Sequence, residues 1–90
     1  MALRERDIER ALVKAVKAAG GEIRKVMWIG RRGAPDRLVL LEGRGPLFVE
    51  LKAPGGRVSR LQDLEHRRLR VGGCRVMVIW KPEQIDEVFA

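Results

Sequence analysis

Two short stretches of this chain carry residue types that can hold a cation or act on a phosphate. The first is Pro35-Asp36 and the second, thirteen residues further on, is Glu50-Leu51-Lys52. Carboxylate oxygens are the ligands that hard divalent cations prefer, and an ammonium group beside them would polarise a water or neutralise charge that develops on a phosphate. The alternative is purely structural, with Glu50–Lys52 or Asp36–Lys52 forming an ion pair at a strand end.

The segments that must position these residues are predicted to be two buried strands. Residues 37–41, which are apolar after Arg37, and the apolar residues 47–49 form two runs of the kind expected for strands covered on both faces of a sheet. Between them, residues 43–46 (Gly-Arg-Gly-Pro) have turn chemistry, which predicts an antiparallel hairpin.

A hairpin loop centred on Arg44 would place Asp36 opposite Lys52, and Leu38 opposite Glu50. Glu50 and Lys52 are two residues apart and therefore share a strand face. Such a register gathers two carboxylates and one ammonium group at one place on an otherwise apolar sheet. Charges there are costly unless they are paired or bind a metal.

The whole chain is predicted to be one α/β domain, residues 1–90, with a mixed four-stranded sheet flanked by helices on both faces. The expected order is α-β-β-β-α-β-α, and the last strand–helix–strand unit predicts a parallel crossover. The other elements are expected as a helix at 4–19, a strand at 22–29, a helix at 59–71, a strand at 74–80 and a closing helix from Lys81-Pro82.

Two acids of the first helix are candidates for a further carboxylate at the site. Glu5 and Glu9 lie one turn apart at the edge of the apolar stripe. Glu5 is nearer the apolar face by helical angle, whereas Glu9 is farther along the helix, so the sequence does not separate them. Each has an ordinary alternative, which is to favour the positive end of the helix dipole.

The second helix carries a residue with two possible roles. Ser59-Arg60-Leu61-Gln62 has the form of a capping box, so Gln62 either only caps the helix or also lines the site. Within this helix Leu61, Leu64 and Leu69 are predicted to pack inwards, with Arg60, Arg67 and Arg70 outwards and His66 on the surface.

Composition points to a polyanionic partner. The net charge is +7, and arginine, which binds phosphate oxygens with its planar fork, supplies most of the excess. The adjacent Arg31 and Arg32 are candidates for gripping a nucleic-acid backbone. The single Cys74 permits no internal disulfide and is expected to be a buried, inert thiol at the start of a strand.

The sequence also carries expectations about location. No apolar run approaches the roughly 20 residues that a membrane-spanning helix needs. The charged N-terminus does not resemble a secretory signal, so the cytoplasm is expected.

The extended motif resembles that of the VRR-NUC nucleases, a branch of the PD-(D/E)XK superfamily. The resemblance rests on Gly33-Ala34-Pro35-Asp36, on Phe48-Val49-Glu50-Leu51-Lys52-Ala53-Pro54-Gly55-Gly56, on Ser59-Arg60-Leu61-Gln62 and on Gly72-Gly73 before a strand. The first-helix run from Glu5 to Leu12 also fits, and the similarity covers essentially the whole chain. Stand-alone members of this kind are typical of phages and prophages, so the expected location of a phage-encoded protein of this kind is the host cytoplasm.

The resemblance implies a role for each motif residue. Asp36, Glu50 and the main-chain carbonyl of Leu51 would bind Mg²⁺ or Mn²⁺, and Lys52 would be the catalytic lysine. Gln62 and one first-helix glutamate, Glu5 or Glu9, would support the site. The expected DNA contacts are made by Arg31, Arg32, Arg57 and Arg60.

The expected activity is metal-dependent endonucleolytic hydrolysis of branched double-stranded DNA, leaving 5′-phosphate and 3′-hydroxyl ends. Small members of the family resemble Holliday-junction resolvases, and symmetrical cutting needs two sites, which predicts a homodimer without a small-molecule cofactor. The alternatives are a less selective nicking or flap nuclease, a non-catalytic DNA-binding module on the same fold, and a basic RNA-associated protein.

Overall fold

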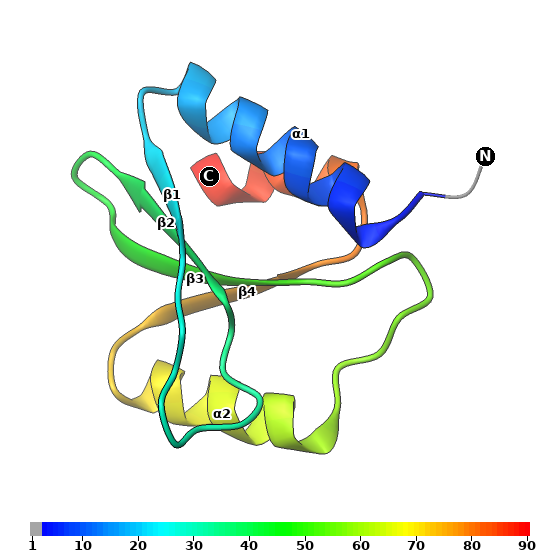
Figure 1. The fold of residues 1–90 in the computed structure, drawn as a ribbon. Helices are drawn as coiled ribbons and strands as arrows, with labels where there is room; N and C mark the ends of the chain where they lie inside the picture. The colour runs from blue at the N-terminus through cyan, green and yellow to red at the C-terminus, as the bar shows by residue number, and fades with distance from the viewer. Residues whose placement is uncertain (1–2) are drawn as a thin grey trace.

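The computed structural model describes residues 3–90, and its elements follow the predicted order. Helices α1 and α2 flank a sheet of four strands, and a closing 3₁₀ helix, η1, follows the last strand (Figure 1). The bounds are α1 Glu5–Ala18, β1 Glu22–Lys25, β2 Arg37–Leu41, β3 Gly45–Leu51, α2 Arg60–Val71, β4 Arg75–Ile79 and η1 Pro82–Phe89.

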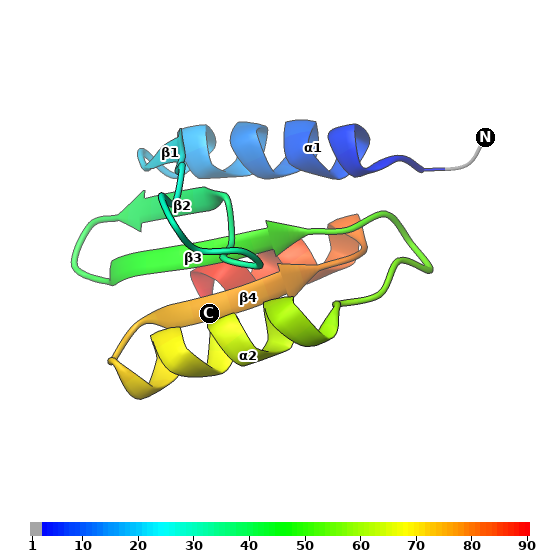
Figure 2. The same cartoon turned by 60° about the horizontal axis from the view of Figure 1, so that its bottom comes forward.

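The sheet is mixed, as predicted, and its strands lie in sequence order. β1, β2 and β3 pair antiparallel, and β3 pairs parallel with β4 through the α2 crossover. α1 and η1 cover one face of the sheet, and α2 covers the other (Figures 1 and 2). The predicted α/β fold class is therefore confirmed.

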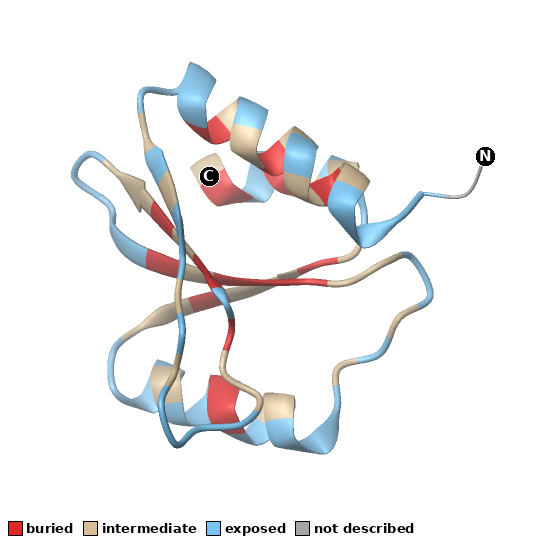
Figure 3. Ribbon diagram, in the orientation of Figure 1, coloured by how far each residue is buried: buried red, intermediate tan, exposed pale blue. Residues whose placement is uncertain are grey.

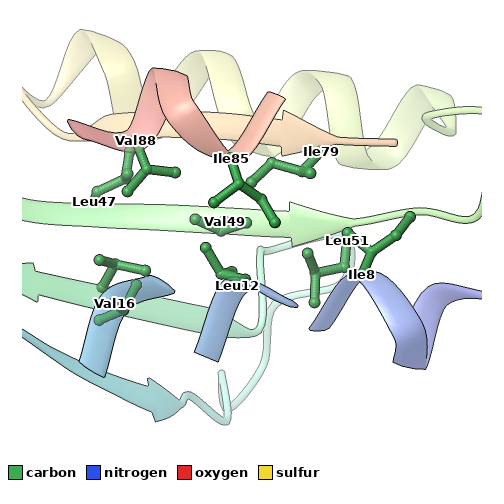
Figure 4. Close-up of a cluster of buried hydrophobic side chains, with 10 residues drawn as sticks. Ile8, Leu12, Val16, Leu47, Val49, Leu51, Ile79, Ile85 and Val88 are labelled. Atoms are coloured by element: carbon green, nitrogen blue, oxygen red, sulfur yellow. The ribbon is translucent and has the colours of Figure 1, made fainter. Parts of the chain in front are cut away.

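The hydrophobic core lies between the sheet and the α1–η1 layer. Its side chains come from every third or fourth position of α1 and from alternate positions of β2 and β3, as the helix and strand periods require. Figures 3 and 4 show this layer, which consists of Ile8, Leu12, Val16, Val39, Leu47, Val49, Leu51, Ile79, Ile85 and Val88. Each fully buried Ile or Leu side chain contributes roughly 1.5–3 kcal/mol to stability.

The hairpin register differs from the predicted one by two residues. Arg37 pairs with Val49 and Leu41 with Gly45, so the turn is centred on Gly43 instead of Arg44. Gly43 adopts φ +74°, a left-handed conformation that favours glycine. The expected pairs Asp36–Lys52 and Leu38–Glu50 are therefore wrong, and continuing the observed register by one residue places Asp36 beside Glu50.

The inward face of α2 also differs from the prediction. Leu61 and Leu64 are 55% and 39% exposed, whereas Glu65 and His66 are only 5% and 2% exposed. The reason is that the sheet face beneath α2 carries Glu50 and Lys52, so the helix presents polar as well as apolar side chains to it. The prediction that His66 lies on the surface is wrong, as is the prediction that Leu61 and Leu64 pack inwards.

Two smaller expectations need correction. The predicted strand 22–29 pairs only as far as Lys25, after which the chain leaves the sheet. Cys74 precedes β4 instead of opening it and is half-buried. No helix of residues 3–90 is long and apolar enough to cross a membrane.

Candidate functional site

The candidate site lies at the end of the sheet where β2 begins and β3 finishes. Asp36 precedes β2, and Glu50 is the second-last residue of β3. Since side chains alternate along a strand, Asp36, Glu50 and Lys52 project to the α2 face, opposite to the core residues Val49 and Leu51. The two-residue change in register keeps every side chain on its predicted face and brings the two carboxylates directly opposite each other.

Glu50 is a buried acid without an opposing partner. It is 9% exposed, and none of the ion pairs among residues 3–90 involves it. Burial first, and then the negative charge of Asp36, raise the pKa of Glu50 to about 7. Lys52 acts in the opposite direction. A carboxylate held in this way is stabilised by any cation that enters beside it.

Glu5 and Glu9, the two first-helix candidates, differ in their relation to Glu50. The charge of Glu5 contributes to raising the pKa of Glu50. Glu9, in contrast, forms an ion pair with the guanidinium of Arg37, on the core side of β2. Glu5, at the N-terminal end of α1, is thus close enough for its charge to act on Glu50, whereas Glu9 is engaged in the ion pair with Arg37.

Arg37 connects the first helix to Asp36, and sequence reasoning assigned it no role. Its side chain is 11% exposed, and it contacts both the Glu9 carboxylate and the Asp36 carboxylate, the latter with Nη1 2.9 Å from Oδ2. Burial opposes the charge, but these two carboxylates outweigh it and raise the pKa of Arg37. The signal was available in principle, because an arginine that opens an apolar strand must find an anionic partner.

His66, which belongs to α2, and Lys52, which follows β3, lie on the same side of the sheet as Glu50. The backbone N–H of Lys52 donates to the carbonyl of Ile79 at 2.9 Å, which ties the end of β3 to β4. Desolvation first, then the positive charges of Arg70 and Lys52, lower the pKa of His66, whereas Asp63 and Glu65 act in the opposite direction. The Nε2 atom of His66 is buried and has no hydrogen-bond partner within residues 3–90.

Gln62 makes the predicted capping box. Its Oε1 accepts from the backbone N–H of Ser59 at 2.9 Å, and its own N–H donates to Ser59 Oγ at 3.1 Å. This contact fixes the first turn of α2, and the half-buried Gln62 backbone lies against Gly33 of the preceding loop. The capping role is confirmed.

Two tryptophans that the sequence prediction left without a role anchor the loops on either side of the site. The indole N–H of Trp28 donates to the carbonyl of Pro35 at 2.6 Å, directly before Asp36. The indole N–H of Trp80 donates to the carbonyl of Gly56 at 2.7 Å, in the loop that follows Lys52. The available signal was the indole itself, since a buried indole N–H needs an acceptor.

Four arginines predicted to contact DNA are exposed and make no ion pair within the described residues. They lie in the two loops and at the first turn of α2, namely Arg31, Arg32, Arg57 and Arg60. An open pocket of about 260 Å³ beside Asp36 is lined by the end of β1 and by Met27. A larger one of about 420 Å³, around Cys74 and Arg75, contains none of the candidate residues.

The residues present fit a hard divalent cation. No group of three or more His, Cys, Asp or Glu side chains within residues 3–90 is arranged to hold a metal by itself. Two facing carboxylates are nevertheless the kind of protein ligand set that Mg²⁺ uses, because this ion keeps several waters and takes remaining ligands from substrate phosphates. The unpaired, partly desolvated carboxylate of Glu50 fits the same conclusion.

Comparison with known proteins agrees with this geometry. No family model matches the chain. The chain is 46% identical over 77 residues to "Putative nuclease p44" of Acyrthosiphon pisum secondary endosymbiont phage 1, which is 86% of this chain and 83% of that protein. A solved structure described as a VRR_NUC domain superposes with a TM-score of 0.85 and 34% identity, over 98% of this chain and 96% of that one. The chain therefore belongs to the VRR-NUC family of nucleases.

Proposed function

We propose that this nuclease is a Mg²⁺- or Mn²⁺-dependent DNA endonuclease that cuts branched duplex DNA. The observation that carries the proposal is the pair of carboxylates of Asp36 and Glu50 at adjacent strand positions, with Lys52 on the same face. In a chain of the VRR-NUC family, an acidic pair beside a lysine supports phosphodiester hydrolysis rather than a structural ion pair.

The proposed metal ligands are Asp36, Glu50 and the main-chain carbonyl of Leu51. A divalent ion bound there supplies Lewis acidity toward the phosphate and toward an attacking water. The Asp36 carboxylate can leave its ion pair with Arg37 and bind a metal ion instead, because its side chain is 57% exposed and this ion pair lies at the edge of the site.

The remaining proposed catalytic groups act on water and on charge. The Lys52 ammonium would hold the attacking water or neutralise the charge that develops on the phosphate oxygens. Glu5 is the proposed further carboxylate, acting through a water, in preference to Glu9. Gln62 would support the site by setting the position of the first turn of α2.

DNA would approach the end of the sheet where β2 begins and β3 finishes. Exposed arginines lie in the segments that flank the acidic residues: Arg31 and Arg32 in the loop before Asp36, Arg57 in the loop after Lys52, and Arg60 at the start of α2. Such contacts to phosphates position a duplex without reading its sequence. We further propose a homodimer acting on four-way junctions, because paired cuts require two sites related by a two-fold axis.

The test is cleavage of an end-labelled four-way junction by the wild-type protein, with Mg²⁺, with Mn²⁺ and with EDTA. Wild type should cut only with a divalent ion, and Asp36→Ala and Lys52→Ala should bind the junction without cutting it. Flap and linear duplexes of the same sequence, tested in parallel, measure the preference for branches. Failure of the wild-type protein to cut any DNA with either ion would contradict the proposal and favour a binding module.

A further inference from the structure

Two long apolar side chains stand almost fully in solvent beside the candidate site. Met27 is 92% exposed and Ile29 is 95% exposed, whereas Val26 and Trp28 are half-buried. The segment follows β1 and lies outside the sheet, and its residues alternate between half-buried and exposed up to the turn that begins at Ile29. Single exposed hydrophobic residues are common, but two such residues on either side of an anchored tryptophan form a local apolar surface.

The backbone behind this pair is held at three places. Trp28 donates to the Pro35 carbonyl at 2.6 Å and packs on Phe48 with ring centroids 5.4 Å apart. The N–H of Val26 donates to the carbonyl of Asp36 at 2.9 Å. Met27 and Asp36 line the same pocket. The apolar pair is therefore fixed next to a proposed metal ligand instead of lying on a free loop.

The loop is also braced by α2. Gly33 has φ +83° and lies so close to the backbone of Leu61 that a Cβ atom there would be 2.7 Å from its carbonyl carbon. This close approach locks the far end of the loop after Arg31 and Arg32. A rigid loop backbone is important here, because an apolar side chain can insert into another molecule only if its own backbone stays in place.

The surroundings of Met27 and Ile29 are cationic. Lys25, Arg31 and Arg32 are exposed, and none of them makes an ion pair within residues 3–90. An apolar centre with cations on both sides matches a molecule with an apolar interior and an anionic exterior, which describes stacked bases between phosphates. A second copy of this chain matches less well, since a symmetric contact would bring the same cations together.

We propose that Met27 and Ile29 form a wedge that enters the base stack at the branch point of the DNA. Apolar side chains such as Met and Ile insert between base steps in other DNA-binding proteins and pay for partial unstacking with a larger contact. A branch point is the place where stacking is weakest. The inference rests on the proposed function, because it places the wedge next to the phosphate to be cut.

The experiment measures base unstacking without cleavage. The wild-type protein is titrated, in EDTA, into a four-way junction that carries 2-aminopurine at the branch point, and into one that carries it in the middle of an arm. The variants are the double substitution Met27→Ser with Ile29→Ser, and the control Val71→Ser. Val71 is 89% exposed at the end of α2. Its substitution by serine therefore removes exposed apolar surface at a place away from the candidate site.

Wild type and Val71→Ser should raise the fluorescence of the branch-point probe several-fold and leave the arm probe unchanged. The double variant should bind the junction about 5–20-fold more weakly, give less than half of the fluorescence rise, and unfold at the same temperature as wild type. Equal fluorescence for the double variant would overturn the wedge, as would conversion of a dimer to a monomer without change in fluorescence.

The wedge and the proposed function fail in different ways. If wild type cuts junctions in Mg²⁺ and the double variant matches it in rate and fluorescence, only the wedge is wrong. If wild type cuts no DNA with either ion, the proposed function is wrong, and the fluorescence still decides on the wedge.

Discussion

Glu50 links the stability of the protein to pH through a single carboxyl group. Its pKa is about 7 in the folded chain, against an ordinary value of 4.5, so the folded protein holds a proton that the unfolded chain has released. The unfolded state binds fewer protons between these values, and the free energy of unfolding should therefore fall as the pH rises from about 4.5 to 7. We expect a loss of about 1–2 kcal/mol over this range.

The measurement is urea unfolding in EDTA at several pH values for wild type and Glu50→Gln. The lowered pKa of His66 contributes to the pH dependence with the opposite sign, and it does so in both proteins. The difference between the two curves therefore isolates Glu50. A difference that does not change with pH would show that the pKa of Glu50 is the same in the folded and the unfolded protein.

Arg37 is predicted to be the most costly arginine to remove among those in ion pairs. Its loss would leave the half-buried carboxylate of Glu9 without a partner and free the Asp36 carboxylate. Breaking a pair of this kind costs about 3 kcal/mol, so Arg37→Ala should lower the free energy of unfolding by about 2–4 kcal/mol. Arg24→Ala is the control, because its pair with Glu22 is exposed and contributes about 0.5 kcal/mol. Equal urea midpoints for the two variants would contradict the prediction.

At the scale of elements, the chemistry of the site was predictable because strand faces depend only on parity. The sequence could not decide among Gly43, Arg44 and Gly45 as the centre of the turn, since both glycines adopt positive φ and each favours a different loop. The resulting two-residue difference in register left Asp36, Glu50 and Lys52 on one face. A difference of one residue would have separated them.

The orientation of α2 was not predictable in the same way. Its leucines suggested one inward face, but the helix packs on a sheet surface that is itself partly charged. His66 is buried there, and its ring has both apolar surface and polar nitrogen atoms. Which acid of α1 reaches the site depended on Arg37, whose partner Glu9 lies 28 residues away along the chain. Contacts of this range have no signature in local periodicity.

The loop between β1 and β2 depends on α2 for its position, and Gly33 is the point of contact. Gly33→Ala would place a Cβ atom 2.7–2.8 Å from the backbone of Leu61 and Gln62 while also forcing φ +83° on an alanine. We expect a loss of stability of about 2 kcal/mol or more, together with weaker DNA binding. Gly30→Ala shares the positive φ, +73°, but meets nothing within 4 Å, so it should cost only about 1 kcal/mol.

Urea unfolding and junction binding measured on both glycine variants check this prediction. If the two variants lose equal stability and bind DNA equally well, the loop is not held by α2. If lowering the temperature restores DNA binding in Gly33→Ala and not in Gly30→Ala, the packing explanation is supported. The contact between the loop and α2 would then be displaced in Gly33→Ala but not lost.

At the scale of the whole molecule, an acidic centre lies within a basic protein. The chain has 19 Lys and Arg against 12 Asp and Glu, yet Asp36, Glu50 and Glu5 gather at one end of the sheet. Free carboxylates repel a phosphate backbone, so the surrounding arginines must supply the attraction until a metal neutralises the centre. The affinity for DNA should therefore be strongly dependent on salt and should rise when Mg²⁺ is added.

The dependence on salt separates local contacts from total charge. Each phosphate neutralised by the protein contributes a slope of about −0.9 to the plot of log affinity against log salt for duplex DNA. Arg31→Ala with Arg32→Ala should therefore reduce the slope by roughly 2. Arg10→Ala with Lys14→Ala removes the same charge from the exposed side of α1 and should leave the slope unchanged. If both double variants change the slope equally, DNA senses only the net charge, and the duplex does not lie against the loop that carries Arg31 and Arg32.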